Sequence, residues 1–445
     1  MASFCARLCK FCTTFKQPPP IALLNWECCP CFNFRYGDLS FILFDTTKVV
    51  KYRFSTVHPQ PSPMMQILHR PSEAWRQLGG LSTAEEISQQ PTVWRELAQA
   101  SVAQQASVAA FLGDWLSNPT NRVLLTGAGS SAYIGEIVAD EINAAWPAEV
   151  RAVASTSLLS HPRHYLDAER PTLLVSFARS GNSPESTATV DLVRSYVTSS
   201  CFINITCNSQ GALAAQGVDQ SDTLNLLMPE ASCDKGFAMT SSFTSMLLAA
   251  LVVFGGRTSN SNILRIEKLA AKAEQLQEAW APRLMNLARG PWERVVYLGS
   301  GPLEALAKEA SLKVLELTAG RVLAMANTSL GFRHGPKSAL NSRTLVVCFL
   351  SCDGHAAKYD QSLLDELRKD QVAGNIAEFG PSGLGNEFAD ETWSDPWLAP
   401  LWLNAAQLIA LQMSAELGLT PDNPFPDGTV NRVVQGVTIY PYGTR

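Results

Sequence analysis

The chain has 445 residues, which at roughly 150 residues per domain corresponds to about three domain-sized units. Its content of 46% hydrophobic and 17% charged residues is typical of a globular protein and excludes a chain that is disordered throughout. A net charge of -5 creates no field that would attract nucleic acid or an anionic membrane, and the longest apolar run, Met246 to Phe254, is too short to span a bilayer.

The N-terminal segment, Met1 to Pro63, differs in composition from the rest of the chain. It holds six of the eleven cysteines and carries a net charge of +4, which leaves -9 for the remainder. Four of these cysteines have the paired C-x2-C spacing of a four-thiolate zinc site, namely Cys9, Cys12, Cys28 and Cys31. The alternative, which we favour, is a disordered or non-native extension, because Met64 and Met65 stand just before the first helical pattern.

The five remaining cysteines are scattered through apolar and loop contexts. Their positions predict free thiols in a reducing compartment, which favours the cytoplasm. No stretch near the N-terminus has the apolar core and cleavage site of a signal peptide, so none is predicted.

A repeated pattern begins near residue 120. Val123 to Ser131, which contains a Gly-x-Gly turn, recurs as Val295 to Leu303, and at the same offset Thr172 to Phe177 recurs as Thr344 to Phe349. Each copy alternates short apolar strands with helices, the order that builds a parallel sheet covered on both faces. The sequence therefore predicts an α/β protein with two tandem doubly wound parallel-sheet domains of flavodoxin-like type and flanking helices.

Helical patterns surround these two copies. Ser82 to Leu116 is predicted helical, with a capping box at Ser82 to Glu85, and further helices are expected over Ile263 to Leu287 and Trp397 to Leu417. The resulting division is an atypical extension, an N-terminal helical segment, a first domain, a connecting helix, a second domain and a tail, over 1–63, 64–119, 120–260, 261–290, 291–420 and 421–445.

Hydroxyl-rich loops come after the predicted strands of the first copy. One contains Ser130 and Ser131, the next contains Arg179, Ser180 and Ser183, and a third loop ending at Thr240 precedes an apolar helix. Free N–H groups and the helix dipole at a helix start both favour an anion, and parallel sheets bind ligands at the carboxyl ends of their strands. The loops are therefore candidates for phosphate binding, although Ser180 and Ser183 could instead only cap a helix.

The helix of the second copy carries charges on an otherwise apolar surface. Glu309, Lys313 and Glu316 share one edge at spacings i, i+4 and i+7, as an acid-base site would need. The alternative is an ordinary Glu–Lys pair that supports the helix by about 0.2–0.5 kcal/mol. His334 lies in a predicted turn further along the chain, and an imidazole there could exchange a proton near neutral pH. No residues outside the N-terminal cysteines have metal-ligand spacing.

Together, these segments resemble the sugar isomerase (SIS) family in the duplicated form found in the isomerase half of glucosamine-6-phosphate synthase. The matching residues are Gly127 to Ser131, Ser180 to Ser183, the Thr240 loop, Glu309 to Glu316 and Arg333 to Pro336. From Met64 to Arg445 the chain is most similar to the bacterial AgaS group, described as galactosamine-6-phosphate deaminase/isomerases or tagatose-6-phosphate ketose/aldose isomerases. The synthase itself is excluded, because too few residues precede the first copy to form its glutaminase domain.

The resemblance implies a role for each matched residue. Ser131, Ser180 and Ser183 would bind the phosphate, with Ser130, Arg179 and Thr240 beside them. Glu316 would move a proton between C2 and C1, Glu309 and Lys313 would support the open-chain sugar, and His334 would assist ring opening. Two departures from the synthase are Gln435, where it carries a Lys, and Arg179, where it carries a Gln.

The sequence therefore predicts an enzyme that converts galactosamine 6-phosphate to tagatose 6-phosphate and ammonia without a metal or organic cofactor. One alternative is simple aldose/ketose isomerisation of tagatose 6-phosphate, and another is a non-catalytic regulator that binds sugar phosphates. In the family His334 reaches the neighbouring subunit's active site, so the resemblance also implies a homo-oligomer with shared sites. Neither nucleic acid nor membrane is expected as a partner.

Overall fold

The computed structural model describes residues 40–45, 48–53, 66–381, 383–385 and 393–443. The chain forms two compact units, Met1–Pro63 and Met64–Arg445. In the first unit, β1 (Ser40–Asp45) pairs antiparallel with β2 (Lys48–Arg53). The other residues of the predicted extension lie outside the described residues. They include the four cysteines of the predicted zinc site.

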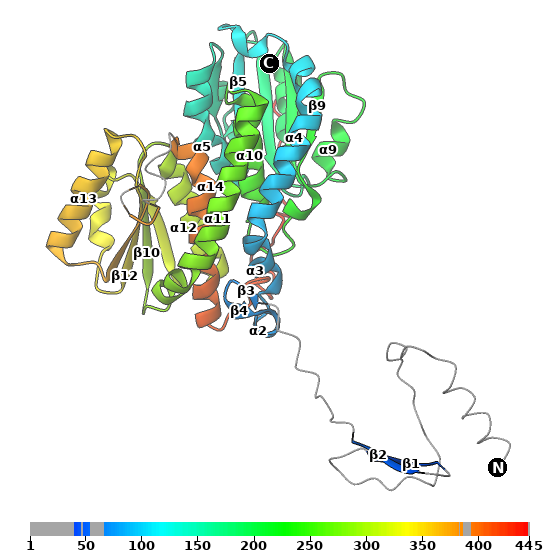
Figure 1. Ribbon diagram of the computed structural model, residues 1–445. Helices are drawn as coiled ribbons and strands as arrows, with labels where there is room; N and C mark the ends of the chain where they lie inside the picture. The colour runs from blue at the N-terminus through cyan, green and yellow to red at the C-terminus, as the bar shows by residue number, and fades with distance from the viewer. Residues whose placement is uncertain (1–39, 46–47, 54–65, 382, 386–392, 444–445) are drawn as a thin grey trace. The chain divides into compact units, whose positions relative to one another are not determined.

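The first sheet of the second unit has five parallel strands in the order β6-β5-β7-β8-β9 (Figure 1). The strands are β5 (Arg122–Thr126), β6 (Glu149–Ala152), β7 (Thr172–Ala178), β8 (Ser200–Thr206) and β9 (Thr223–Leu227). This is the flavodoxin-like order, in which the first strand lies between the second and the third. Every residue of β5 and β7 is buried, which explains why both strands are almost continuously apolar.

The second sheet repeats this arrangement with four parallel strands in the order β11-β10-β12-β13. They are β10 (Arg294–Gly299), β11 (Leu323–Asn327), β12 (Thr344–Phe349) and β13 (Asn375–Phe379). The prediction of an α/β protein with two parallel-sheet domains is confirmed.

Long helices occupy the space between the two sheets (Figure 1). They are α4 (Gln90–Leu112), α5 (Ser130–Ala145), α10 (Ser241–Phe254), α11 (Ser259–Ala288), α12 (Pro302–Leu317) and α14 (Asp395–Glu416). Helix α12 packs against α5, α14 and the second sheet, and α10 packs against α4 and α5. One hydrophobic core therefore runs from the inner face of one sheet through these helices to the other.

Each sheet has a separate core on its outer face. Helix α8 (Pro184–Tyr196) covers the first sheet and α13 (Ala356–Asp370) covers the second. The short elements are β3 (Gln66–Ile67), β4 (Arg70–Pro71), α2 (Ser72–Gln77), α3 (Leu81–Ser88), η1 (Trp115–Ser117), α6 (Ser155–Ser160), α7 (Pro162–Tyr165), α9 (Ala212–Gln216), η2 (Glu230–Ser232), η3 (Gly331–Arg333) and η4 (Pro336–Ala339). Among the described residues, no helix combines the length and apolarity that crossing a membrane requires.

The constant offset between the two copies also relates their helices. Both ends of α5 and α12 are separated by the same offset as the repeated strands, and so are the first residues of α8 and α13. Gly129 and Gly301 precede α5 and α12 with the same positive φ of 56°, which a residue with a side chain adopts at a cost. The strand-to-helix turn is therefore built in the same way in both copies.

The predicted helix over Ser82 to Leu116 is divided in the structure. Helix α3 ends at Ser88 and α4 begins at Gln90. The capping box predicted at Ser82 to Glu85 is wrong, because α3 starts earlier and no side chain of its own caps it. Instead, the Asp422 carboxylate accepts hydrogen bonds from the backbone N–H groups of Ser82 and Thr83, at 3.1 and 2.8 Å. The cap comes from the other end of the chain, which a local pattern cannot show.

Candidate active site

The three charged residues of α12 form one cluster. Lys313 Nζ lies 3.2 Å from Glu309 Oε1 and 2.5 Å from Glu316 Oε2. The side chains of Lys313 and Glu309 are fully buried, whereas 22% of the Glu316 side chain is exposed. Burial of charges is costly unless they are paired, so a pair that only supported a helix would be expected on the surface. Glu316 is the member of the cluster that solvent and ligands can reach.

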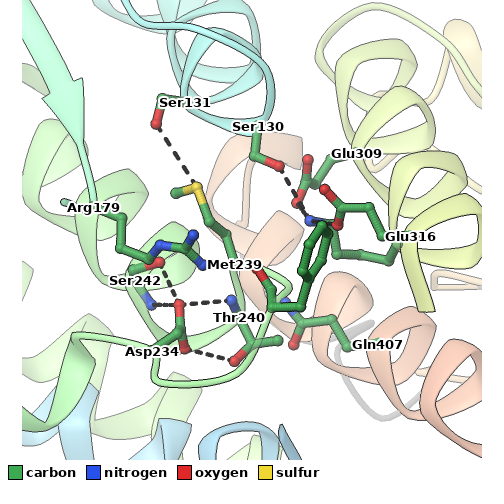
Figure 2. A network of polar contacts seen from close by, with 12 residues as sticks. Ser130, Ser131, Arg179, Asp234, Met239, Thr240, Ser242, Glu309, Glu316 and Gln407 are labelled. Carbon is green, nitrogen blue, oxygen red and sulfur yellow. Dashed lines mark hydrogen bonds and ion pairs between the residues drawn. The ribbon is translucent and has the colours of Figure 1, made fainter. Parts of the chain in front are cut away.

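The cluster also contacts the first domain. Lys313 Nζ donates a hydrogen bond of 3.2 Å to Ser130 Oγ, at the first residue of α5 (Figure 2). The ammonium is thus ion-paired with Glu309 and Glu316 and hydrogen-bonded to Ser130. Lys313 is therefore a fixed positive charge that joins the two copies at their helices, rather than a free amine.

Burial shifts the ionisation of this cluster. Loss of hydration raises the pKa of Glu309 to about 7, although attraction to Lys313 opposes the rise. Burial by itself would lower the pKa of Lys313, but the two carboxylates outweigh this effect and raise it. Neither oxygen of Glu309 accepts a well-aligned hydrogen bond from the described residues. Glu309 can therefore hold or release a proton near neutral pH.

The candidate phosphate loops lie next to one another. Strands β5 and β7 are neighbours, so the loops after them meet at the same edge of the sheet. Ser130 and Ser131 are buried in the first turn of α5, where the helix leaves N–H groups unpaired. Gly127 is required for this turn, because a Cβ there would lie 2.6 Å from Ser131.

The second loop is shaped by its own hydrogen bonds. Ser180 Oγ accepts a bond of 3.2 Å from the Asn182 N–H, and Gly181 has a positive φ of 63°. Ser183 precedes α8, and its hydroxyl contacts that of Ser186 at 2.8 Å rather than capping the helix. The Ser183 side chain does not make the hydrogen bond that a helix cap would require. The first turn of α8 therefore keeps N–H groups that could bind an anion.

Thr240 has a different environment from the one expected of a phosphate ligand. Its hydroxyl and its N–H both donate to the Asp234 carboxylate, at 2.7 and 2.9 Å. The same carboxylate accepts from the N–H groups of Ser241 and Ser242 at the start of α10, at 2.9 and 3.1 Å (Figure 2). The only hydroxyl proton of Thr240 is thus committed, so the structure gives this residue a capping role and not the predicted hydrogen bond to phosphate.

Arg179 is also committed to the protein. Its guanidinium donates to the carbonyl oxygens of Phe237 and Arg432, both at 3.0 Å. Arg432 in turn donates to the carbonyl oxygens of Asp234 and Gly236. The two arginines fasten the C-terminal tail to the loop before α10, and the phosphate contact predicted for Arg179 stays a prediction.

Glu86 supports the same loop from α3. Its carboxylate accepts hydrogen bonds from the N–H groups of Lys235 and Gly236. Burial, with a contribution from the nearby Asp234, raises the pKa of Glu86 to about 8. The loop is therefore held by its own Asp234 and by Glu86, Arg179 and Arg432 from three other segments.

His334 lies apart from this network within the chain. It comes directly after η3, its backbone N–H donates to the Gly331 carbonyl oxygen, and its side chain is exposed. Asp234, Glu86 and Arg432 were not among the residues that the sequence predicted for the site. No local pattern could have found them, because their hydrogen-bond partners are distant in sequence.

The geometry can be compared with known proteins. No family model matches the chain. An AgaS protein of Streptomyces coelicolor is 46% identical over 370 residues, which cover 80% of this chain and 95% of that protein. The D-galactosamine-6-phosphate deaminase AgaS of Shewanella sp. is 40% identical over 395 residues, with 86% and 99% covered. The chain belongs to the AgaS family.

Solved structures agree with this assignment. The tagatose-6-phosphate ketose/aldose isomerase of Escherichia coli is 37% identical with a TM-score of 0.75, and the match covers 82% of this chain and 98% of that one. A structure from Clostridium novyi NT is 39% identical with a TM-score of 0.78, covering 85% and 100%. The C-terminal domain of the glucosamine-fructose-6-phosphate aminotransferase from Francisella tularensis is 17% identical with a TM-score of 0.62, which shows a shared fold alone.

Proposed function

We propose that this AgaS protein is an aminosugar-phosphate deaminase/isomerase, which converts galactosamine 6-phosphate to tagatose 6-phosphate and ammonia. The observation that carries this proposal is the Glu309–Lys313–Glu316 cluster beside the first turn of α5. It combines a partly exposed carboxylate with an anion-binding helix start. The relative from Shewanella, named a D-galactosamine-6-phosphate deaminase, supports the choice of substrate.

In the proposed reaction, the phosphate is bound by Ser131, Ser180, Ser183 and the N–H groups of the two helix starts. The sugar ring opens to expose the C1 aldehyde. Glu316 removes the C2 proton and returns a proton to C1, so that C1 becomes a hydroxymethyl carbon and C2 an imine. Water then adds to the imine and releases ammonia, leaving the ketone of tagatose 6-phosphate. No step requires a metal or organic cofactor.

The rest of the cluster positions Glu316. Lys313 is buried and paired with both carboxylates and with Ser130, so its role is to hold them in a fixed geometry. Glu309, which is paired with Lys313 and has a pKa near neutrality, can hold or release a proton within the cluster.

Ring opening is assigned to His334 of a neighbouring subunit. Within one chain this imidazole is exposed and lies outside the cluster's contacts. We therefore propose a homo-oligomer in which each active site is completed by a second copy. The five described cysteines without disulfide bonds support a reducing, cytoplasmic location.

The deciding experiment measures ammonia release from galactosamine 6-phosphate, with glucosamine 6-phosphate and N-acetylgalactosamine 6-phosphate alongside. Release from galactosamine 6-phosphate alone supports the proposal. The second candidate is isomerisation of tagatose 6-phosphate, which the name of the Escherichia coli structure favours. Interconversion of tagatose 6-phosphate with its aldose, without ammonia from any amino sugar, would replace the first proposal with the second.

A further inference from the structure

Gln407 of α14 carries a buried hydrogen-bond donor that has no acceptor. Its relative exposure is 0%, and Nε2 has no hydrogen-bond partner among the described residues. Buried polar groups are nearly always satisfied, and the exceptions often occur where a ligand or water completes the bonding. The donor is therefore open to an acceptor on a bound molecule.

A chain of hydrogen bonds fixes which end of the Gln407 amide is the donor. The Trp94 indole, which can only donate, gives its proton to Thr244 Oγ1 at 3.0 Å. The Thr244 hydroxyl then has its own proton to donate, and Gln90 Oε1 at 3.0 Å is its nearest acceptor, whereas the carbonyl oxygens within reach are 3.4 and 3.5 Å away. The amide of Gln90 therefore turns its nitrogen away from Thr244.

This orientation is passed on to Gln407. Gln90 Nε2 donates to Gln407 Oε1 at 2.7 Å, so Gln407 Oε1 is the accepting end and Nε2 faces away from Gln90. Both amides and Thr244 are fully buried, so no solvent competes for these bonds. Three side chains thus hold one amide nitrogen in a set direction, which is how a fold fixes a ligand contact in advance.

The helix that carries Gln407 packs against the elements of the proposed site. Helix α14 packs against α12, which carries the charged cluster, and against α10, which begins after Thr240. Figure 2 draws Gln407 in the same view as Glu316 and Thr240, with no contact marked between Gln407 and the residues drawn. Gln407 therefore lies on the helix that packs against both the helix of the charged cluster and the helix that follows Thr240.

We propose that Gln407 Nε2 donates a hydrogen bond to a hydroxyl oxygen on the carbon chain of the bound open-chain sugar phosphate. This inference rests on the proposed function, because it takes the sugar phosphate as the ligand of the cluster. Gln407 is then a substrate-contacting residue, and Trp94, Thr244 and Gln90 are the residues that position it.

Two substitutions test the donor. Gln407→Leu removes both ends of the amide, whereas Gln407→Glu keeps the acceptor for Gln90 and replaces the free nitrogen with an oxygen. Both are expected to lower kcat/KM for galactosamine 6-phosphate by about tenfold or more, the loss that goes with one hydrogen bond. Inhibition by inorganic phosphate should not change, because the phosphate loops are untouched. If inhibition by inorganic phosphate weakened as much as kcat/KM fell, the substitutions would be disturbing the whole site, and the proposal would be overturned.

Gln412 provides a matched control on the same helix. It is also fully buried, but its Oε1 accepts from Arg70 at 3.2 Å and its Nε2 donates to Glu416. Gln412→Leu should therefore lower the melting temperature while leaving kcat/KM within about twofold of the wild type. A loss of kcat/KM equal to that of Gln407→Leu would show that any buried glutamine of α14 has this effect, and the proposal would fall.

Substrate analogues test the contact in the unaltered protein. Analogues of galactosamine 6-phosphate that lack the hydroxyl at C3, C4 or C5 are compared on the wild type and on Gln407→Leu. With the wild type, one analogue should have a kcat/KM about tenfold lower than that of galactosamine 6-phosphate. With Gln407→Leu, this analogue and galactosamine 6-phosphate should have equal kcat/KM, because the hydrogen bond has already been removed from the protein side. If all three losses are the same in both proteins, Gln407 does not contact a sugar hydroxyl.

Failure of the proposed function is a separate outcome. If the wild type releases no ammonia, deamination is wrong, and the same comparison is made on isomerisation of tagatose 6-phosphate. If neither sugar phosphate is converted, the comparison uses the Kd of galactosamine 6-phosphate from calorimetry. Gln407→Leu should then weaken that Kd about tenfold relative to Gln412→Leu, and equal Kd values would reject the inference.

Discussion

Glu136 of α5 and Lys308 of α12 form an ion pair of 2.9 Å across the two copies. Their separation along the chain equals the offset that relates the bounds of the two helices. Equivalent positions of the two helices thus face each other in the middle of the molecule. The neighbouring charges differ between the helices, because Glu309, Lys313 and Glu316 correspond to Ile137, Glu141 and Ala144. The acid-base cluster is therefore present on one helix of the pair.

Glu316→Gln should nearly abolish turnover while leaving the substrate bound. The amide cannot accept the C2 proton, and general-base catalysis typically contributes about 10²–10⁴-fold. Ammonia release and exchange of the C2 hydrogen with deuterated water are measured together with the Kd of galactosamine 6-phosphate. Glu304→Gln is the control, because Glu304 lies on the same helix and is exposed. Turnover within about tenfold of the wild type would show that another group is the base.

Lys313→Met should destabilise the fold by about 3–5 kcal/mol, because it leaves buried carboxylates without their cation. Urea unfolding gives this number directly. Adding Glu309→Leu to Lys313→Met should recover part of the loss, since the buried charge is then removed as well. Lys308→Met serves as the comparison, and its half-exposed pair with Glu136 should cost at most about 1 kcal/mol. A similar small cost for Lys313→Met would contradict the role of this ion cluster.

Glu86 should make the stability fall as the pH rises. Its folded pKa is about 8, above the ordinary value of 4.5, so the folded state binds more protons than the unfolded state between these values. The free energy of unfolding therefore decreases from about pH 4.5 to 8 and this contribution is constant above that range. Urea unfolding from about pH 5 to 9 should show a smaller decrease for Glu86→Gln. Glu85→Gln is the control, because Glu85 is the exposed neighbour of Glu86. This substitution should leave the pH dependence of the free energy of unfolding unchanged.

Asp234→Ala should destabilise the protein by about 3 kcal/mol or more. Three buried N–H groups at the start of α10 lose their acceptor, and each unsatisfied group costs about 1–3 kcal/mol. Asp234→Asn retains one acceptor oxygen and should cost less. Hydrogen exchange of the amides of Thr240, Ser241 and Ser242 measures the effect locally. Unchanged protection of these amides in Asp234→Ala would argue against the cap.

The repeat made much of the fold accessible from sequence. Two strands and a Gly-x-Gly turn recurred at one offset, and the structure places them as β5, β7, β10 and β12. Local patterns were less reliable where a distant residue takes part. The capping box at Ser82 failed because Asp422 supplies the acceptor, and Thr240 differs from its expected role because Asp234 takes its proton.

By itself, the sequence determined the repeated strands and the long helices, the two parallel sheets they form, and which family the chain resembles. These properties depend on periodicity and on motifs that lie within a few residues of each other. Only the tertiary structure decided that Lys313 is buried against Ser130 of the other copy, that Arg179 binds carbonyl oxygens, and that Gln407 has a free donor. The reason is physical: burial and hydrogen-bond partners depend on which helices pack together, and those helices lie far apart along the chain.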